Sequence, residues 1–545
     1  MRSVSRLRWV LALFFSSGVF VGSPTVFAQT PGQIRTLIQQ AEEFESQRKW
    51  EEARQIYEVV LGKADPSLKI RERYHRAVRR CWQARRHNDP SYRKEVLSVD
   101  YGQALRLHHA ITKSLLDESL DKQKLNPTKL FNKGLEELDA ALSDPLFLDQ
   151  HVPADKRGLV PEFRTQVRKT WGNKGEMSRK EAAKQIGEIA MAAEFYLNLN
   201  PTVVTMELAC GSCYAIDEYT VYLTPNQLSE LAQNLTRTEA VGVGLALTIR
   251  DNLIVIHRIV PDGPADRSDD PIQVNDEIIS VNKKAVVDLP LHAVRALLEG
   301  PTGSLVEIEL LTPGAAMGRS VMLSRQRPQS VDLVWGSLMA PHAAIGVIKL
   351  GQFTDATPAD VDEAIARLSE RGSKAMILDL RGNGGGIFES AIDTAGRFLS
   401  TGIVTSTLNQ DTKQSKVFHA KNPKALTIPL VVLVDGDTAS AAEVLAGALK
   451  DNNRAILIGQ TTFGKGCTQR VLRLPNALGG VPTGGMKLTV ERFFSPKGVA
   501  YSGRGIVPHF LVEDRMDPGS QANMMHDPVM ARAIEELSRP LAMPK

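Results

Sequence analysis

Three short segments in the last third of this 545-residue chain carry residues whose types and spacing could do chemistry. Residues 377–386 form an apolar run that ends in glycines, whose backbone N–H groups can point into open space and bind an anion or an oxyanion. Residues 430–443 form an apolar run and a tight turn that leads to Ser440, where a helix begins, so its hydroxyl lies near the positive end of the helix dipole. Residues 458–469 place Lys465 between two glycines after the end of a strand. The segments therefore offer a hydroxyl, an amine and N–H donors.

Each segment, taken alone, also has a purely structural interpretation. Ser440 and Glu443 have the spacing of an N-capping box, which by itself explains both residues. Lys465 alone fits a solvated loop residue. The run 459–465 resembles a phosphate-binding loop, but Gly466 stands where such a loop needs Ser or Thr for Mg²⁺. The chemistry therefore depends on whether the fold brings the segments together.

The elements that must position these segments follow an alternating pattern. From about residue 342, apolar strands alternate with helical stretches, which predicts a sheet with covering helices. We expect strands at 345–350, 375–380, 430–434 and 455–458, and helices at 358–371, 388–399 and 439–449. Each chemical segment then begins at one of these strands.

A β-rich region precedes this core. Short β-like runs at 241–249, 253–260, 277–281 and 305–311 are separated by Gly, Pro and Asp turn signals. The pattern predicts a small domain of short strands between the core and the residues before it.

The N-terminal third is predicted to be helical. Residues 41–66 place small and aromatic residues at helical spacing and resemble one tetratricopeptide repeat, through Ala41, Phe44, Trp50, Ala53, Tyr57 and Leu61. We find one good copy only, so an ordinary helical hairpin explains the pattern equally well. Further helices are expected at 130–142 and 179–197. The residues after 518 are Met-rich and polar, and are predicted to form a tail.

The first 28 residues have the layout of a secretory signal. Arg2, Arg6 and Arg8 precede an apolar run, and small residues lead to a predicted cleavage after Ala28. The alternative is an uncleaved anchor helix, although the apolar run is short of the roughly 20 residues that span a membrane. We therefore expect an extracytoplasmic, periplasmic protein, anchored only if the segment is retained.

The composition excludes several classes of protein. Apolar residues make up 43% and charged residues 23% of the chain, which argues against a disordered chain, a collagen-like fibre and a polytopic membrane protein. The net charge of +4 falls to +1 without the three leader arginines, so nucleic acid is not an expected partner. Four cysteines exclude a disulfide-built scaffold. Cys210 and Cys213 could form a local disulfide, but they have no second ligand pair nearby for zinc, and no metal or cofactor is expected.

Taken together, the three segments resemble the signature blocks of the carboxyl-terminal processing (tail-specific) serine peptidases. The blocks are LRGNGGG at 380–386, TASAAEVLAGAL at 438–449 and GQTTFGKGCTQ at 459–469. Their order and the 25-residue gap from Ser440 to Lys465 also match. The resemblance covers roughly 190–512, with further likeness at 216–223, 488–498 and 503–508.

The resemblance implies a Ser–Lys mechanism. Ser440 would be the nucleophile and Lys465 the general base, which must be neutral to accept a proton. Burial can lower a lysine pKa by roughly 3–5 units. Gln469 matches the position that orients the lysine, and backbone N–H groups of Ala441 and Gly385 would form the oxyanion hole.

The sequence departs from the family pattern at two positions. Gly384 stands where the family usually has Pro, which loosens the turn without removing donors, and His509 replaces the usual Asp. Cys467 is an alternative nucleophile, but none of the 11 histidines lies close to it in sequence to act as its base.

Residues 225–327 resemble a PDZ domain. The carboxylate-binding turn and the peptide-pairing strand would comprise Gly242, Val243, Gly244, Leu245 and Leu247. A peptide C-terminus would add to the sheet edge while N–H groups capture its carboxylate. An apolar pocket, with Val294 and Leu297 of the following helix, would favour an apolar terminal residue. The alternative is a β-rich insertion without a ligand.

The expected fold is multidomain α+β. It comprises a signal (1–28), a helical region with one tetratricopeptide-like hairpin (29–224), a β-rich PDZ domain (225–327), an α/β protease core of crotonase/Clp-like architecture (328–515) and a tail (516–545). The expected function is an exported endopeptidase that recognises protein C-termini as substrates, with no cofactor and with a possible protein partner at the helical repeat. The alternatives are a non-catalytic PDZ scaffold and a crotonase-like acyl-CoA enzyme.

Overall fold

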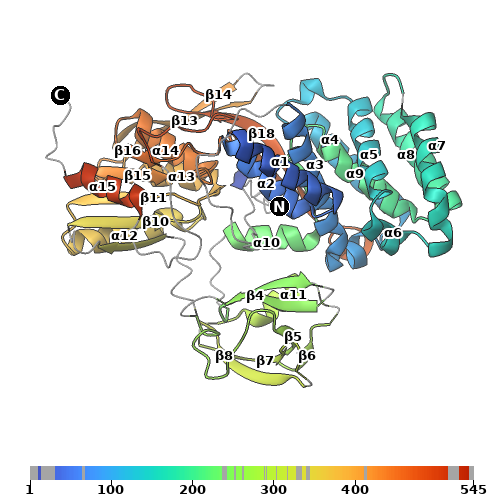
Figure 1. The fold of residues 1–545 in the computed structure, drawn as a ribbon, viewed down its shortest axis with the longest axis horizontal. Coiled ribbons are helices and arrows are strands. Elements are labelled where there is room, and N and C mark those ends of the chain that lie inside the picture. Colours follow the sequence, from blue (N-terminus) through green and yellow to red (C-terminus); the bar gives the residue numbers. More distant parts are fainter. Residues whose placement is uncertain are drawn as a thin grey trace, which may run out of the picture.

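The computed structural model describes most of the chain. The described residues are 10–13, 31–63, 68–172, 174–235, 242–250, 253–259, 263–287, 289, 291–301, 303–315, 317–326, 334–338, 344–409, 414–512 and 527–538. Apart from 10–13, the predicted signal segment lies outside them. The described parts form a helical region, an α/β core and a smaller β lobe beside both (Figure 1).

The helical region packs through small residues. It comprises α1 (Pro31–Ser46), α2 (Trp50–Lys63), α3 (Leu68–Asn88), η1 (Tyr92–Val96), α4 (Tyr101–Glu118), η2 (Lys122–Lys124), α5 (Pro127–Ala141), α6 (Pro145–His151), η3 (Ala154–Leu159), α7 (Val160–Trp171), α8 (Arg179–Leu197) and α9 (Pro201–Cys213). Ala41 and Ala53 are fully buried in the α1–α2 hairpin. Where α5 meets α9, a Cβ added to Gly134 would lie 2.7 Å from the Leu208 carbonyl oxygen. Side-chain-free positions thus allow these backbones to approach closely.

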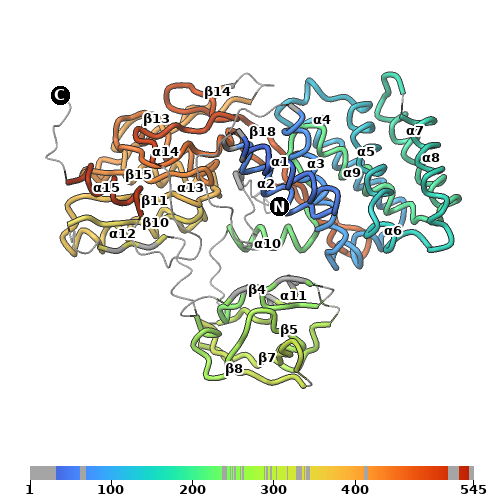
Figure 2. Tube along the Cα trace, in the orientation of Figure 1, coloured from blue at the N-terminus to red at the C-terminus, as the bar shows by residue number. Residues whose placement is uncertain are grey.

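The helical region and the C-terminal part of the chain share one hydrophobic core. Side chains of α4, α5, α8 and α9 pack with Met486, Leu488 and Val490 of β18 (Gly485–Phe494). Figure 2 shows α4, α5, α8 and α9, coloured light blue to green, grouped on one side of the molecule. The helical region is therefore packed against the core across a distance of hundreds of residues in sequence.

The predicted strand–helix alternation is present in the α/β core. Its first sheet has the order β19-β16-β15-β11-β10-β9, and its inner strands are parallel. The strands are β9 (Val334–Leu338), β10 (Ile345–Leu350), β11 (Ala375–Asp379), β15 (Leu430–Val434), β16 (Ile456–Gly459) and β19 (Phe510–Leu511). Helices α12 (Thr357–Glu370), α13 (Phe388–Ala395) and α14 (Ala441–Asp451) share one apolar core with this sheet, and α15 (Pro528–Ser538) shares another. The region predicted to be a tail thus contains a packed helix.

A second sheet lies beside the first and has the order β12-β1-β17-β18-β13-β14, with β2 paired to β18. Its strands besides β18 are β1 (Val10–Leu13), β2 (Val221–Leu223), β12 (Gly385–Ile387), β13 (Thr401–Asn409), β14 (Gln414–Lys421) and β17 (Cys467–Arg473). Strand β12 follows the glycine turn, and β17 follows the loop that carries Lys465. The two sheets therefore converge on the three chemical segments.

The β lobe has one five-strand path, β3-β4-β5-β7-β8, with β6 beside β5. Its elements are β3 (Leu245–Arg250), β4 (Leu253–Ile259), β5 (Glu277–Val281), β6 (Lys284–Ala285), α11 (Leu291–Leu298), β7 (Leu305–Leu311) and β8 (Arg319–Ser324). Helix α10 (Pro225–Leu235) precedes it and packs on β2 and Ile387. All four predicted β runs of this region are strands.

Two further observations concern sites and compartments. In the described residues, no helix combines the length and apolarity needed to cross a membrane, and no group of three or more His, Cys, Asp or Glu residues is arranged to hold a metal ion. Cys210 and Cys213 lie on α9 as buried free thiols, so the local disulfide left open by the sequence is not formed.

Candidate active site

Ser440 lies in a strained turn between β15 and α14. Its backbone angles are φ 61° and ψ −115°, a conformation that costs of order 1–3 kcal/mol for a residue with a side chain. The residue is fully buried, and its Oγ has no hydrogen-bond partner among the described residues. Because the hydroxyl does not cap the helix, the capping-box interpretation explains the Glu443 side of the pair but leaves the serine hydroxyl without a structural role.

The Glu443 carboxylate joins the serine turn to the lysine loop. Oε2 accepts hydrogen bonds from the backbone N–H groups of Ser440 and Lys465, both at 2.8 Å. Oε1 accepts from the Thr462 hydroxyl at 2.6 Å and the Gly464 N–H at 2.8 Å. Burial raises the pKa of Glu443 to about 7 against the opposing effect of these donors. One side chain, read from the sequence only as a helix cap, thus fixes the two segments relative to each other.

Lys465 is a buried lysine, with 1% of its surface exposed. Its ammonium lies 4.9 Å from the ring centroid of Tyr219, within cation–π range. Burial lowers its pKa to about 8, although Cys467 and Asp217, among other acidic groups, act in the opposite direction. Such an amine is partly neutral near pH 8, as a general base requires. In this arrangement it is not hydrogen-bonded to the Ser440 hydroxyl.

A second buried lysine lies near the first. Lys487 of β18 is 4% exposed, and its amine is 5.8 Å from the Trp82 ring centroid. Burial lowers its pKa to about 7, and the positive charge of Lys465 lowers it further. Nothing in the local sequence distinguishes Lys487 from a strand lysine that faces solvent, so its burial could not be predicted from the sequence.

Gln469 lies on β17, the strand that follows the lysine loop, and is fully buried. Its Nε2 donates to Cys467 Sγ at 3.2 Å and to Thr489 Oγ1 at 3.3 Å, while its Oε1 has no partner among the described residues. Burial raises the pKa of the Cys467 thiol to about 12, so the thiol is protonated and a poor nucleophile at neutral pH.

The glycine turn lies between β11 and α13. Gly386 has φ 144°, and an added Cβ would lie 2.0 Å from the Phe353 carbonyl oxygen, so only glycine fits there. The Gly385 N–H donates to Asn383 Oδ1 at 2.9 Å and must exchange that bond before it can bind an oxyanion. The N–H groups of Ala441 and Gly384 have no acceptor among the described residues. Two donors are thus open here and a third is held by a side chain.

An extended segment occupies the slot between the glycine turn and the lysine strand. Residues Val10–Leu13 pair antiparallel with Gly385–Ile387 on one side and with Gln469 and Arg470 on the other. The slot therefore accepts a peptide backbone as an additional strand beside the predicted site residues.

The predicted peptide groove lies between β3 and α11 of the β lobe. Strand β3 pairs only with β4 among the described strands, so its other edge is open. Val243, Leu247 and Val294 are buried in the lobe's core, whereas Leu245 and Leu297 are partly exposed. The structure thus brings the predicted residues to one edge, with Leu245 and Leu297 as its accessible apolar side chains.

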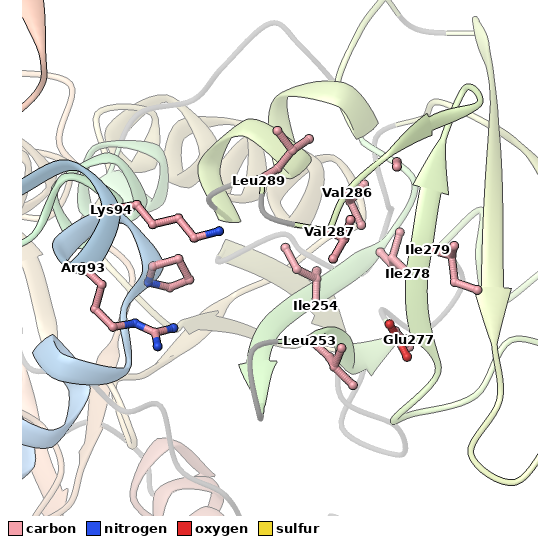
Figure 3. Close-up of a pocket in the computed structure, with 12 residues that line it drawn as sticks. Arg93, Lys94, Leu253, Ile254, Glu277, Ile278, Ile279, Val286, Val287 and Leu289 are labelled. Atoms are coloured by element: carbon pink, nitrogen blue, oxygen red, sulfur yellow. The ribbon is translucent and has the colours of Figure 1, made fainter. Parts of the chain in front are cut away.

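A cavity of about 290 Å³ lies elsewhere, where η1 meets the β lobe. Figure 3 shows Arg93 and Lys94 of η1 on one wall, opposite Leu253, Ile254 and Val287 of the lobe. None of the predicted catalytic residues lines it.

His509, the departure with no explanation from sequence, has a local structural role. Its ring Nδ1 accepts a hydrogen bond from the Leu457 backbone N–H at 2.9 Å. The backbone N–H of His509 donates to the Leu457 carbonyl oxygen. The neutral imidazole therefore satisfies a backbone N–H of β16 next to the point where β19 pairs with that strand.

Comparison with known proteins assigns this chain to a family. The family model "Peptidase family S41" matches residues 344–512, and the model "PDZ domain" matches 233–312. The chain is 34% identical over 301 residues to the carboxyl-terminal-processing protease of Synechocystis sp., covering 55% of this chain and 68% of that protein. It is 32% identical over 318 residues to the chloroplastic C-terminal processing peptidase of Tetradesmus obliquus, covering 55% and 66%.

Among solved structures, the photosystem II D1 C-terminal processing protease is 26% identical, with a TM-score of 0.37 over 75% of this chain and 93% of that one. The chain spans about two thirds of the length of the two curated relatives. The two family-model matches and the similarity to the Synechocystis protease confirm the family resemblance found in the sequence, and they support the catalytic interpretation and not the scaffold. The chain belongs to the carboxyl-terminal processing serine peptidases of family S41 and carries a PDZ domain.

Proposed function

We propose that Ser440 and Lys465 form the catalytic dyad of this peptidase. The observation that carries the proposal is the Glu443 carboxylate, which binds the backbone N–H groups of both residues and so holds the serine turn against the lysine loop. The Ser440 hydroxyl, which has no hydrogen-bond partner in the described part of the chain, and the lowered pKa of Lys465 support the same roles.

The reaction is acyl transfer. Ser440 Oγ attacks the peptide carbonyl carbon and its proton passes to the Lys465 amine, so a C–O bond forms as the carbonyl π electrons move to oxygen. Collapse of this intermediate breaks the C–N bond, and Lys465 returns the proton to the leaving amine. Water then hydrolyses the acyl-enzyme by the same proton route and releases a carboxylate.

The oxyanion of the intermediate is bound by the N–H of Ala441 together with the glycine turn. Gly385 supplies its N–H once the bond to Asn383 is exchanged, and Gly384 offers an additional donor. Loss of one such donor typically lowers the rate about 10²–10³-fold. Gln469 orients the lysine from β17 through its Oε1, which has no other hydrogen-bond partner among the residues that the structure describes.

The substrate is a protein or peptide C-terminus, as the names of the relatives indicate for those proteins. The PDZ turn from Gly242 to Gly244 captures the terminal carboxylate, and an apolar terminal side chain lies between Leu245 and Leu297. The scissile segment is bound as a strand in the slot that Val10–Leu13 occupies here.

Three further expectations from sequence complete the proposal. The mature protein is exported to the periplasm after cleavage at Ala28, and the domain boundaries are 29–224, 225–327 and 328–515, with the crotonase/Clp-like architecture in the last. The α1–α2 hairpin is tetratricopeptide-like and available for a protein partner.

The test is cleavage of an unfolded substrate with an apolar C-terminus by the parent and by Ser440→Ala and Lys465→Ala variants. We expect cleavage by the parent only, with all three proteins unfolding at similar temperatures. Equal cleavage by all three would refute the dyad. Cleavage that persists in Ser440→Ala but is lost in Cys467→Ser would identify the thiol as the nucleophile.

A further inference from the structure

Helix α15 packs directly on the sheet that carries the catalytic segments. Its Val529, Met530 and Ala533 are buried against β10, β11, β15 and β16. Figure 1 shows this red helix alongside β11 and β15. Its position places the start of the helix near the carboxyl end of β11, where the glycine turn begins.

Asp527, immediately before α15, uses its two carboxylate oxygens differently. Oδ1 accepts from the Val529 and Met530 N–H groups, both at 3.0 Å, and so caps the helix. Oδ2 lies 2.7 Å from Nη1 of Arg381, and the Asp527 residue is only 7% exposed. The residue thus has a capping role and, separately, an ionic one.

Arg381 is held between two carboxylates at the start of the glycine turn. Its Nε and Nη2 donate to Asp379 at 3.0 and 2.8 Å, while Nη1 faces Asp527. Its backbone N–H also binds Asp379, and the next residue, Gly382, donates its N–H to the Asp435 carboxylate ahead of the serine turn. The guanidinium therefore fixes the chain at Arg381, where the glycine turn begins after β11. Arg381 lies two residues before Asn383.

We propose that Asp527 is a positioning residue for the oxyanion turn, and that α15 acts through it to keep the Gly384–Gly386 N–H donors in register with Ser440. The inference rests on the proposed function of that turn. With Asp527 neutral, Arg381 keeps only Asp379 as an ionic partner and can rotate toward solvent. The start of the glycine turn is then held by one carboxylate and no longer by two. The effect should fall on the transition state, where the oxyanion exists, and not on substrate binding.

The experiment separates the cap from the charge in the full chain. Asp527→Asn keeps an N-cap acceptor and removes the charge, whereas Asp527→Glu keeps the charge in a poorer cap. Glu535→Gln is the matched control, because it removes an exposed ion pair with Arg532 on the same helix. The readouts are kcat, KM and the inhibition constant of a substrate-derived peptide aldehyde, whose adduct with the serine requires the oxyanion hole.

For Asp527→Asn we expect kcat to fall about tenfold, less than the loss of a whole donor, with KM within twofold. The aldehyde inhibition constant should rise by the same factor, and Asp527→Glu and Glu535→Gln should stay within twofold of the parent in kcat. An unchanged kcat in Asp527→Asn, or a loss in Asp527→Glu that matches a drop in its melting temperature, would overturn the inference. A parent enzyme without serine-dependent cleavage would instead refute the proposed function.

Discussion

The Glu443 carboxylate offers the sharpest test of how the active site is held together. Replacing it with glutamine keeps the shape of the side chain but leaves one oxygen to serve four donors. The amide NH₂ must then face either the Ser440 and Lys465 N–H groups or the Thr462 hydroxyl and Gly464 N–H. At least two hydrogen bonds to a charged group are lost. Each backbone N–H that faces the amide NH₂ is left opposite another donor, whereas the Thr462 hydroxyl can turn to accept.

Above its pKa of about 7 the Glu443 carboxyl group is charged. A hydrogen bond to a charged group contributes about 1.5–3 kcal/mol, so above that pH the loss of two corresponds to about 3–6 kcal/mol. We expect part of this energy to appear as a lower free energy of unfolding and part as a loss of dyad alignment. Each ~2.7 kcal/mol lost from the stabilisation of the transition state lowers kcat/KM about 10²-fold. Urea denaturation measures the first quantity, and hydrolysis of a fluorogenic peptide measures the second.

A matched control separates stability from positioning. Glu137 is another buried acid, paired with Arg80 in the helical region and away from the dyad. Glu137→Gln should also lower the free energy of unfolding, because it weakens a buried ion pair, yet it should retain kcat. A Glu443→Gln enzyme with kcat within twofold of the parent would refute the positioning role, and so would an equal loss of kcat in Glu137→Gln.

Four further expectations follow from the geometry. Because burial lowers the pKa of Lys465 from 10.5 to about 8, kcat/KM should rise as pH increases through 8, and a flat profile from pH 6 to 9 would contradict a lysine base. Burial of the charged Lys465 amine destabilises the folded protein, and this cost is fully present below pH 8. Lys465→Met removes the buried charge, so it should raise the free energy of unfolding at pH 7, measured in urea, by up to about 3 kcal/mol. The same variant lacks the base and should not cleave. Burial lowers the pKa of His509, whose imidazole must be neutral to accept the hydrogen bond from the Leu457 N–H. The stabilisation by this bond is therefore present above the unfolded pKa of 6.5 and is lost as pH falls through the folded pKa. Between pH 7 and 5 the melting temperature should drop less in His509→Asn than in the parent, and equal drops would argue against this bond. Leu297 and Leu245 are the partly exposed apolar side chains of the predicted peptide site. In the Ser440→Ala protein, Leu297→Asp should weaken the binding of apolar C-terminal peptides, measured by fluorescence anisotropy, about tenfold or more. Unchanged affinity would place the ligand elsewhere.

Local sequence was sufficient for the elements and for the identity of the chemical segments. The alternation that predicts strands at 375–380 and 430–434 depends on apolar runs and turn residues within each segment, and both strands are present within a residue of the predicted bounds. Helix α15 was missed because its buried side is short and packs on a core whose buried residues come mainly from strands more than 60 positions earlier.

The sequence by itself determined the family, the order of the blocks, and Ser440 and Lys465 as candidates, because those features are encoded by residue type and spacing along the chain. Only the tertiary structure decided what Glu443 does, since its partners in the lysine loop lie about 20 residues away and no local spacing specifies them. It also decided that Lys465 is buried enough to lose its proton near pH 8, and that Asp527 reaches Arg381. Burial and hydrogen bonding depend on which distant segments pack together, and that is a property of the folded chain.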